Sequence, residues 1–317
     1  MRGKLKTKNK KIKLIFWILI FFLLFFIGWG RKIVSKIYQS PIFKNEKVNL
    51  IFFDYNNLFL FSLNPQEEEL KIFTFPGDLY LETVYGYGKY KINSLFDLDS
   101  LEKKEGRLFL ETIKENLFFP FDGYLISEEK IDFSNKNSII KSLFQLLKNK
   151  KQGNLSRVEI FWLWLKIKGF RQDKIYVQGE KEKVLKKVLI SSKEEGWELD
   201  EDNFLKIIGN SFSYPQIIKE SFSLAIFNGT SYQRLGERVA KRIEVLGGRV
   251  VEIDNYQENL EDICLLITTK EKKESFTAKK VSSFFDCRWQ EAKEENRRWD
   301  LTLVIGKKYW QKLKEKW

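Results

Sequence analysis

Histidine is absent from this chain of 317 residues, and its absence removes several classes of enzyme at once. Ser-His-Asp and Cys-His hydrolases, enzymes with a histidine general base and histidine-ligated metal sites all need an imidazole side chain. Any reacting groups must therefore be sought among other residue types.

Cysteine is nearly absent as well, with Cys264 and Cys287 as its two occurrences. Two cysteines in an extracellular segment allow one disulfide, and the alternative is a pair of buried thiols. The sequence leaves both states open.

Positive charge is plentiful, but it is unevenly placed. The net charge is +13, and residues 1–36 contain ten lysines and arginines without a single acid. The rest of the chain therefore carries only +3. This distribution argues against DNA or RNA as a partner and favours contact between the basic N-terminal segment and anionic lipid head groups.

The longest apolar run is residues 14–30, which follow seven of these cations. A helix of this length spans about 25 Å, slightly less than a hydrocarbon core of ~30 Å. Trp17 and Trp29 suit the two membrane interfaces, and the cations predict a cytoplasmic N-terminus with the remainder outside the cell. The alternative is a cleaved signal peptide, whose cleavage site usually contains alanine, but the first alanine is Ala225. We therefore expect a single-pass signal-anchor.

The segment after the anchor begins with three apolar stretches separated by turns. Residues 48–57, 58–70 and 71–78 predict neighbouring strands, and Asp54 and Asp78 lie at the ends of the first and third. Residues 94–118 have helical spacing that is interrupted near Gly106, and residues 119–126 predict another strand.

This order, with SLNP at 62–65, PGD at 76–78, KIN at 91–93 and PFDGYLI at 120–126, resembles the LytR-CpsA-Psr family. Members of that family are membrane-anchored and transfer glycopolymers from a polyprenyl diphosphate carrier to the cell wall. The resemblance implies an α+β core with a central mixed sheet. It also implies that Asp54 and Asp78 are the catalytic carboxylates and that Lys91 and Asn93 are ligand-binding residues.

Departures from the family pattern bear on activity. The family's second aspartate has no clear match among Asn56, Asn57 and Leu58, and its arginine-rich helical motif is absent from residues 138–151. Phe52 stands where the family has glycine, and Gly77 stands where it has the catalytic arginine. Opening a diphosphate needs cations on the phosphate oxygens, and lysine does not reproduce the planar clamp of arginine. Asp54 and Asp78 could hold Mg²⁺ if the protein is active. The alternative is that both aspartates are ordinary turn residues after strands.

A loop at residues 85–90 contains three tyrosines and two glycines. Tyr85 and Tyr87 are candidate ligand-binding residues, because exposed aromatic rings can stack on sugars. The alternative is a glycine-enabled turn whose tyrosines cover the edge of the sheet.

Residues 138–170 predict two amphipathic helices separated near Gly153, the second of them strongly aromatic. That second helix either packs against the sheet or lies with its aromatic face on the outer membrane leaflet. The charged stretch that follows, with its carboxylate cluster between Glu194 and Asp202, is expected to be a solvated connector.

The last part of the chain predicts a small α/β domain. Strands are expected at 223–230, 249–254, 263–269 and 299–310, and helices at 232–248 and 275–285. The motifs IFNGT at 226–230 and LVIG at 303–306 resemble the LytR C-terminal domain. Its turn at Asn228 either binds a phosphate or simply caps the helix.

The expected organisation is a basic cytoplasmic tail (1–13), a transmembrane helix (14–30), a stalk (31–47), a LytR-CpsA-Psr-like domain (48–214) and a LytR C-terminal-like domain (215–317). We expect an impaired, binding or scaffold protein of cell-envelope glycopolymer assembly. The alternative is an active Mg-dependent phosphotransferase. The expected partners are membrane lipid and a polyprenyl-linked glycan or peptidoglycan, without nucleic acid.

Overall fold

The computed structural model describes residues 40–149, 152–178, 181–191, 194–292 and 298–314. Backbone contacts divide the chain into Met1–Asn45 and a compact unit, Glu46–Trp317. The described part of the first unit holds the short helix α2 (Pro41–Lys44), which begins after Ser40. The expected transmembrane helix at 14–30 lies outside the described residues, and within them no helix has the length and apolarity to cross a membrane.

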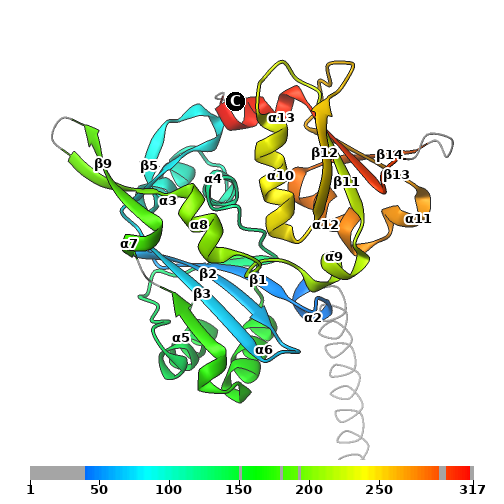
Figure 1. Ribbon diagram of the computed structural model, residues 1–317. Helices are drawn as coiled ribbons and strands as arrows, with labels where there is room; N and C mark the ends of the chain where they lie inside the picture. The colour runs from blue at the N-terminus through cyan, green and yellow to red at the C-terminus, as the bar shows by residue number, and fades with distance from the viewer. Residues whose placement is uncertain (1–39, 150–151, 179–180, 192–193, 293–297, 315–317) are drawn as a thin grey trace, which may run out of the picture. The chain divides into compact units, whose positions relative to one another are not determined.

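The compact unit is mixed α/β, as expected, and is built on three sheets (Figure 1). The first sheet has the order β7-β6-β1-β2-β3-β8. Its strands are β1 (Val48–Phe53), β2 (Asn57–Asn64), β3 (Glu69–Pro76), β6 (Gly123–Ile126), β7 (Gln152–Gly153) and β8 (Ile175–Gln178). Strands β1, β2 and β3 pair antiparallel, whereas β6 and β8 join them in parallel, so the predicted central mixed sheet is confirmed.

Every residue of β1 is buried because helices cover both faces of this sheet. In Figure 1, α5 and α6 lie on one face and α8 on the other. The helices of this region are α3 (Ile92–Leu101), α4 (Arg107–Leu117), α5 (Lys136–Lys148), α6 (Arg157–Gly169), α7 (Lys181–Val184) and α8 (Glu201–Ile208), with one-turn helices η1 (Val84–Gly86) and η2 (Gln172–Lys174). The break at Gly106 is confirmed: this residue has φ of +86°, and its N–H donates to the Asp99 carboxylate. Asn135 and Ser156 cap α5 and α6, their side chains accepting hydrogen bonds from the N–H groups of Ser138 and Glu159.

The charged stretch between residues 181 and 208 corrects the sequence prediction. Instead of a solvated connector it forms β9 (Leu185–Ser191), β10 (Glu194–Leu199) and α8. With β4 (Leu79–Glu82) and β5 (Lys89–Lys91) the two strands make a sheet of order β5-β4-β10-β9. Their apolar residues are too few to dominate the pattern, but Trp197 packs against the core and Phe204 is fully buried.

The C-terminal part contains the third sheet, of order β12-β11-β15-β13-β14. Its elements are α9 (Pro215–Glu220), β11 (Ser223–Asn228), α10 (Leu235–Leu246), β12 (Arg249–Asn255), β13 (Cys264–Thr268), α11 (Lys270–Lys273), α12 (Phe276–Phe285), β14 (Arg288–Glu291), β15 (Leu301–Ile305) and α13 (Lys307–Lys314). The predicted strand–helix–strand unit is confirmed, with β11 and β12 parallel and α10 ending at Gly247 in the left-handed region. The closing strand stops at Ile305, because Gly306 turns the chain and Tyr309 and Leu313 bury one face of a helix instead.

A buried ionic contact joins helix α4 to helices α10 and α13. Arg242 is 0% exposed and Glu115 2%, and the Arg242 guanidinium forms an ion pair with the Glu115 carboxylate. Arg242 Nη1 also donates to Tyr309 Oη at 3.0 Å, and that hydroxyl donates to Glu115 Oε1 at 3.1 Å. Segments far apart in the sequence are therefore held together by charges without access to water.

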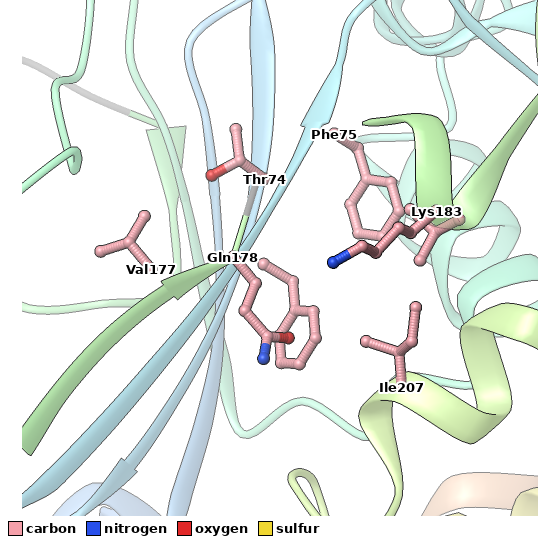
Figure 2. A pocket seen from close by; sticks show the side chains of 8 residues that line it. Thr74, Phe75, Val177, Gln178, Lys183 and Ile207 are labelled. Carbon is pink, nitrogen blue, oxygen red and sulfur yellow. The ribbon is translucent and has the colours of Figure 1, made fainter. Parts of the chain in front are cut away.

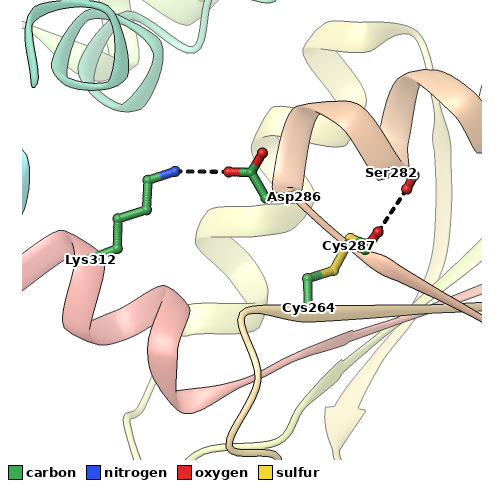
Figure 3. Close-up of a disulfide and its surroundings, with 5 residues drawn as sticks. All are labelled: Cys264, Ser282, Asp286, Cys287 and Lys312. Carbon is green, nitrogen blue, oxygen red and sulfur yellow. Dashed lines mark hydrogen bonds and ion pairs between the residues drawn. A yellow bond between two sulfur atoms is a disulfide. The ribbon is translucent and has the colours of Figure 1, made fainter. Parts of the chain in front are cut away.

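Cys264 and Cys287 form a disulfide, so the first of the two alternatives is confirmed. The bond ties β13 to the residue before β14, and the Ser282 hydroxyl donates to the Cys287 carbonyl oxygen at 3.0 Å (Figure 3). Lys312 of α13 pairs with Asp286 at 3.3 Å beside it.

Reduction of this disulfide is expected to lower the free energy of unfolding by about 3 kcal/mol, the chain-entropy value for a loop of roughly two dozen residues. Urea unfolding with and without reductant measures the change. A Cys264→Ala/Cys287→Ala variant serves as the control and should not respond to reductant. An identical midpoint for the parent protein in both conditions, with two thiols open to alkylation, would contradict the bond.

Candidate functional site

Asp54 lies in the turn between β1 and β2, where its carboxylate is held by backbone N–H groups. Oδ1 accepts from Asn56 N at 3.1 Å and from Asn57 N at 2.7 Å, and Oδ2 accepts from Ile131 N at 2.7 Å. The residue is 2% exposed. The Asp54 carboxylate therefore stabilises the turn and connects the segment before α5 to this turn. Asp54 thus acts as a turn residue, the alternative given above to a catalytic carboxylate.

Gly77 packs its backbone directly against that turn. Its N–H donates to the Asn56 carbonyl oxygen at 2.6 Å. A Cβ atom at position 77 would lie 2.9 Å from the carbonyl oxygens of both Tyr55 and Asn56, which is closer than side chains tolerate. Position 77, where the resemblance predicts an arginine, is thus packed against the backbone of the neighbouring turn, and only glycine fits there without a shift of that backbone.

Asp78 is exposed and borders a hollow of about 230 Å³, which we call the Asp78 hollow. Its lining residues are Asp78, Tyr80, Lys91, Lys187, Glu195, Gly196 and Trp197. Lys91 Nζ lies 5.3 Å from the centre of the Tyr80 ring, and Lys187 Nζ lies 5.5 Å from the centre of the Trp197 ring.

The structure thus brings together two of the predicted site residues, Asp78 and Lys91. Asn93 follows Lys91 after one intervening residue, but it does not line the hollow. Its N–H donates to the Gly77 carbonyl oxygen at 2.9 Å, and its side chain accepts from Ser94 Oγ. Lys187 and Trp197 were missed because they belong to the hairpin that sequence reasoning treated as a connector. Aromatic rings, ammonium groups and carboxylates in one small hollow can bind a sugar ring by its face and its hydroxyl groups.

The donor groups do not fit a magnesium site shared by Asp54 and Asp78. Asp54 does not line the Asp78 hollow, and both of its oxygens already accept N–H groups. Across the described part of the chain, no three residues among histidine, cysteine, aspartate and glutamate come together as a metal-binding group.

Tyr85 and Tyr87 are not among the residues that line the Asp78 hollow. Tyr85 is half-buried with φ of +63°, and burial raises the pKa of its hydroxyl. The Tyr87 hydroxyl donates to Glu102 Oε2 at 2.7 Å, and this hydrogen bond raises the Tyr87 pKa to about 12. Thr83 closes the loop through N–H and hydroxyl bonds to the Gly88 carbonyl oxygen. The loop is thus built as a turn.

A larger cavity of about 670 Å³, the Phe133 cavity, lies beside the Asp54 turn. Its lining residues are Asn57, Phe59, Thr74, Lys130, Ile131, Asp132, Phe133, Ser134, Ser138, Lys141, Ser142, Gln145 and Val177. The Phe59 and Phe133 rings, 5.0 Å apart, form an apolar part of its wall. Lys130 and Lys141 outnumber Asp132, whose pKa is lowered by hydrogen bonds from Ser134. A ligand with an apolar chain and an anionic head matches this lining.

A second apolar pocket of about 240 Å³ shares Thr74 and Val177 with the Phe133 cavity. Phe73 and Phe75 of β3 line it, together with Ile207 of α8 and the stem of Lys183 (Figure 2). Neither pocket was predicted, since the residues come from distant segments and carry no shared sequence pattern.

Neither a protein-family profile nor a curated protein sequence matches this chain. Solved structures resemble it in fold over about half of its length. Bacillus subtilis TagV is 15% identical with a TM-score of 0.38, covering 51% of this chain and 94% of that one. The transcriptional regulator yvhJ from Bacillus subtilis is 16% identical with a TM-score of 0.39, and the similarity covers 51% of this chain and 94% of that one. TagT bound to LIIa-WTA is 12% identical with a TM-score of 0.36, and the similarity covers 51% of this chain and 87% of that one.

Proposed function

We propose that this protein is a membrane-anchored, extracytoplasmic component of cell-envelope glycopolymer assembly that binds a lipid-linked glycan without transferring it. The observation that carries the proposal is the packing of Gly77 against the carbonyl oxygens of Tyr55 and Asn56. A transfer site needs cations placed on the phosphate oxygens as charge develops, and the backbone occupies the place of the arginine.

Binding is supported by the Phe133 cavity, which opens beside the same turn. Asn57 lines this cavity, and Ile131, another lining residue, donates to Asp54. The aromatic part of the wall suits an isoprenoid chain, and Lys130 and Lys141 suit the phosphates of a carrier.

The extracytoplasmic location rests on the apolar run at 14–30 with its preceding cations. The disulfide between Cys264 and Cys287 gives independent support. Disulfides persist in oxidising compartments and are rare in the cytosol.

The full chain, purified in nanodiscs, is expected to bind a polyprenyl diphosphate. Replacing either Lys130 or Lys141 with alanine should raise the Kd about tenfold, since each removes one charge-assisted contact to phosphate. Lys206→Ala is the matched control, because Lys206 is exposed on α8 and does not line the Phe133 cavity. Equal affinities for all variants would remove the cavity from the proposal.

The same preparation distinguishes binding from catalysis. With Mg²⁺, a glycan-linked polyprenyl diphosphate and a peptidoglycan acceptor, we expect no release of polyprenyl monophosphate. The Asp78→Asn variant should behave as the parent protein does. Mg-dependent turnover that Asp78→Asn abolishes would establish the alternative, an active phosphotransferase.

A further inference from the structure

The outer side of helices α5 and α6 presents large apolar side chains to solvent. Phe144 of α5 is 46% exposed, and Phe161 and Leu165 of α6 are 47% and 49% exposed. Trp164 connects them, with its ring centre 5.7 Å from that of Phe161 and 6.2 Å from that of Phe144. We call these four residues the aromatic face. The opposite side of α6, including Leu163 and Ile167, is buried.

Exposed lysines lie around the aromatic face. Lys148 Nζ is 4.5 Å from the centre of the Phe144 ring, and Lys168 Nζ is 5.0 Å from that of Trp164. Lys141 is exposed one helical turn before Phe144 on α5. Aromatic side chains interleaved with ammonium groups are typical of helices that lie in a lipid interface.

The charge of this helix pair differs from that of the surrounding chain. Helices α5 and α6 together contain six lysines and arginines and one acid, Glu159, which is buried in the capping box of α6. The pair thus carries +5, whereas all residues after position 37 sum to only +3. The rest of the extramembrane chain is therefore net negative, and the positive charge is concentrated where the apolar rings are exposed.

We propose that the aromatic face docks on the surface of a lipid bilayer rich in anionic head groups. The rings would enter the head-group region while Lys141, Lys148 and Lys168 pair with lipid phosphates. A second copy of the chain is a poorer occupant, because a symmetric contact would bring two +5 surfaces together. Docking would place α5, and with it the wall of the Phe133 cavity, at the depth where lipid-linked substrates are embedded.

The inference rests on the proposed function in one respect: the proposed membrane anchor would hold the aromatic face at a high effective concentration near the bilayer. Residues 31–47 join the expected transmembrane helix to β1, and 17 extended residues reach at most about 60 Å. The tether would therefore keep the compact unit close enough for weak docking to be populated.

The test uses the full chain in vesicles of phosphatidylglycerol and phosphatidylcholine, with an environment-sensitive dye on Leu165→Cys. Spin-labelled lipids should quench this dye strongly, and the quenching should fall in pure phosphatidylcholine or at high salt. A dye on Leu101→Cys, which is 79% exposed at the end of α3, is the reference for a water-facing position.

Charge reversal provides the matched comparison. Lys141→Glu/Lys148→Glu/Lys168→Glu should reduce quenching of the Leu165→Cys dye to the Leu101→Cys level. Lys206→Glu/Lys270→Glu/Lys308→Glu, with the same charge change at exposed positions elsewhere, should leave it intact. Equal quenching at both dye positions would overturn the inference. It would also be overturned if shielding of the Leu165→Cys dye from water increased with protein density rather than with lipid charge, because a second copy of the chain would then cover the aromatic face.

Anchoring is measured separately in the same vesicles by alkaline extraction. A chain that resists extraction but whose Leu165→Cys dye stays in water contradicts the docking alone. A chain that is extracted, yet quenched before extraction, contradicts the anchor and leaves the docking in place.

Discussion

Replacing Arg242 with methionine is expected to lower the free energy of unfolding of the compact unit by about 3–5 kcal/mol. Methionine fills much of the volume, but the carboxylate of Glu115 then remains buried without its ionic partner. Removing one member of a buried ion pair costs this much because the remaining charge cannot regain water. The Tyr309 hydroxyl is the remaining donor to that carboxylate among the contacts described above.

Urea unfolding followed by tryptophan fluorescence and by circular dichroism measures this loss. Lys241→Met is the control. Lys241 precedes Arg242 on α10 and forms surface ion pairs with Glu201 and Asp202, so its replacement should change stability by less than about 1 kcal/mol. The double variant Glu115→Leu/Arg242→Met should recover most of the loss, because no unpaired charge is left. A single Arg242→Met variant as stable as the parent protein would contradict the contact.

The same variant also bears on the boundary predicted near residue 214. Glu115 belongs to α4 and Arg242 to α10, so their contact couples the two parts that the sequence separates. If it provides the coupling, the two spectroscopic transitions of Arg242→Met should no longer coincide.

Gly77→Arg, which places an arginine where the sequence resemblance predicts one, is expected to destabilise the protein without creating transferase activity. Even Gly77→Ala should cost about 1–3 kcal/mol, the usual penalty for atoms forced into occupied space. The two carbonyl oxygens that meet the new Cβ belong to a turn fixed by Asp54, so they cannot retreat without breaking its hydrogen bonds.

Two measurements together test Gly77→Arg: thermal unfolding, and the release of polyprenyl monophosphate in the presence of Mg²⁺ and a peptidoglycan acceptor. Gly169→Ala is a control of opposite sign, because a Cβ there meets no atom within 4 Å and helix α6 gains from losing its glycine. A Gly77→Arg protein with parental stability and Mg-dependent turnover would show that the turn can move, and that an enzyme had been lost through one residue.

The order of strands and helices was largely predictable because it depends on local patterns. Apolar stretches gave β1, β2 and β3, and helical spacing with Gly106 as its interruption gave α3 and α4. Caps at Asn135 and Ser156, and Gly247 after α10, acted through backbone geometry that a few adjacent residues decide. The charged hairpin of β9 and β10 was not predicted, because its pairing with β4, rather than its own composition, holds it in place.

The candidate site shows the opposite case. Asp54 and Asp78 look equivalent along the chain, since each follows an apolar strand. In the fold, the Asp54 carboxylate accepts two N–H groups from its own turn and one from the distant Ile131, whereas Asp78 borders a hollow with Lys91 and Lys187. Local sequence does not show the contacts with Ile131 and Lys187.

By itself the sequence determined the mixed α/β class, the absence of histidine chemistry and the placing of most positive charge in residues 1–36. The tertiary structure decided why position 77 is glycine, that the two cysteines are bonded and which charges are buried together. The physical reason is range. Hydrophobic periodicity and capping act within a few residues, whereas close backbone contacts, disulfides and buried ion pairs join atoms that only the folded chain brings together.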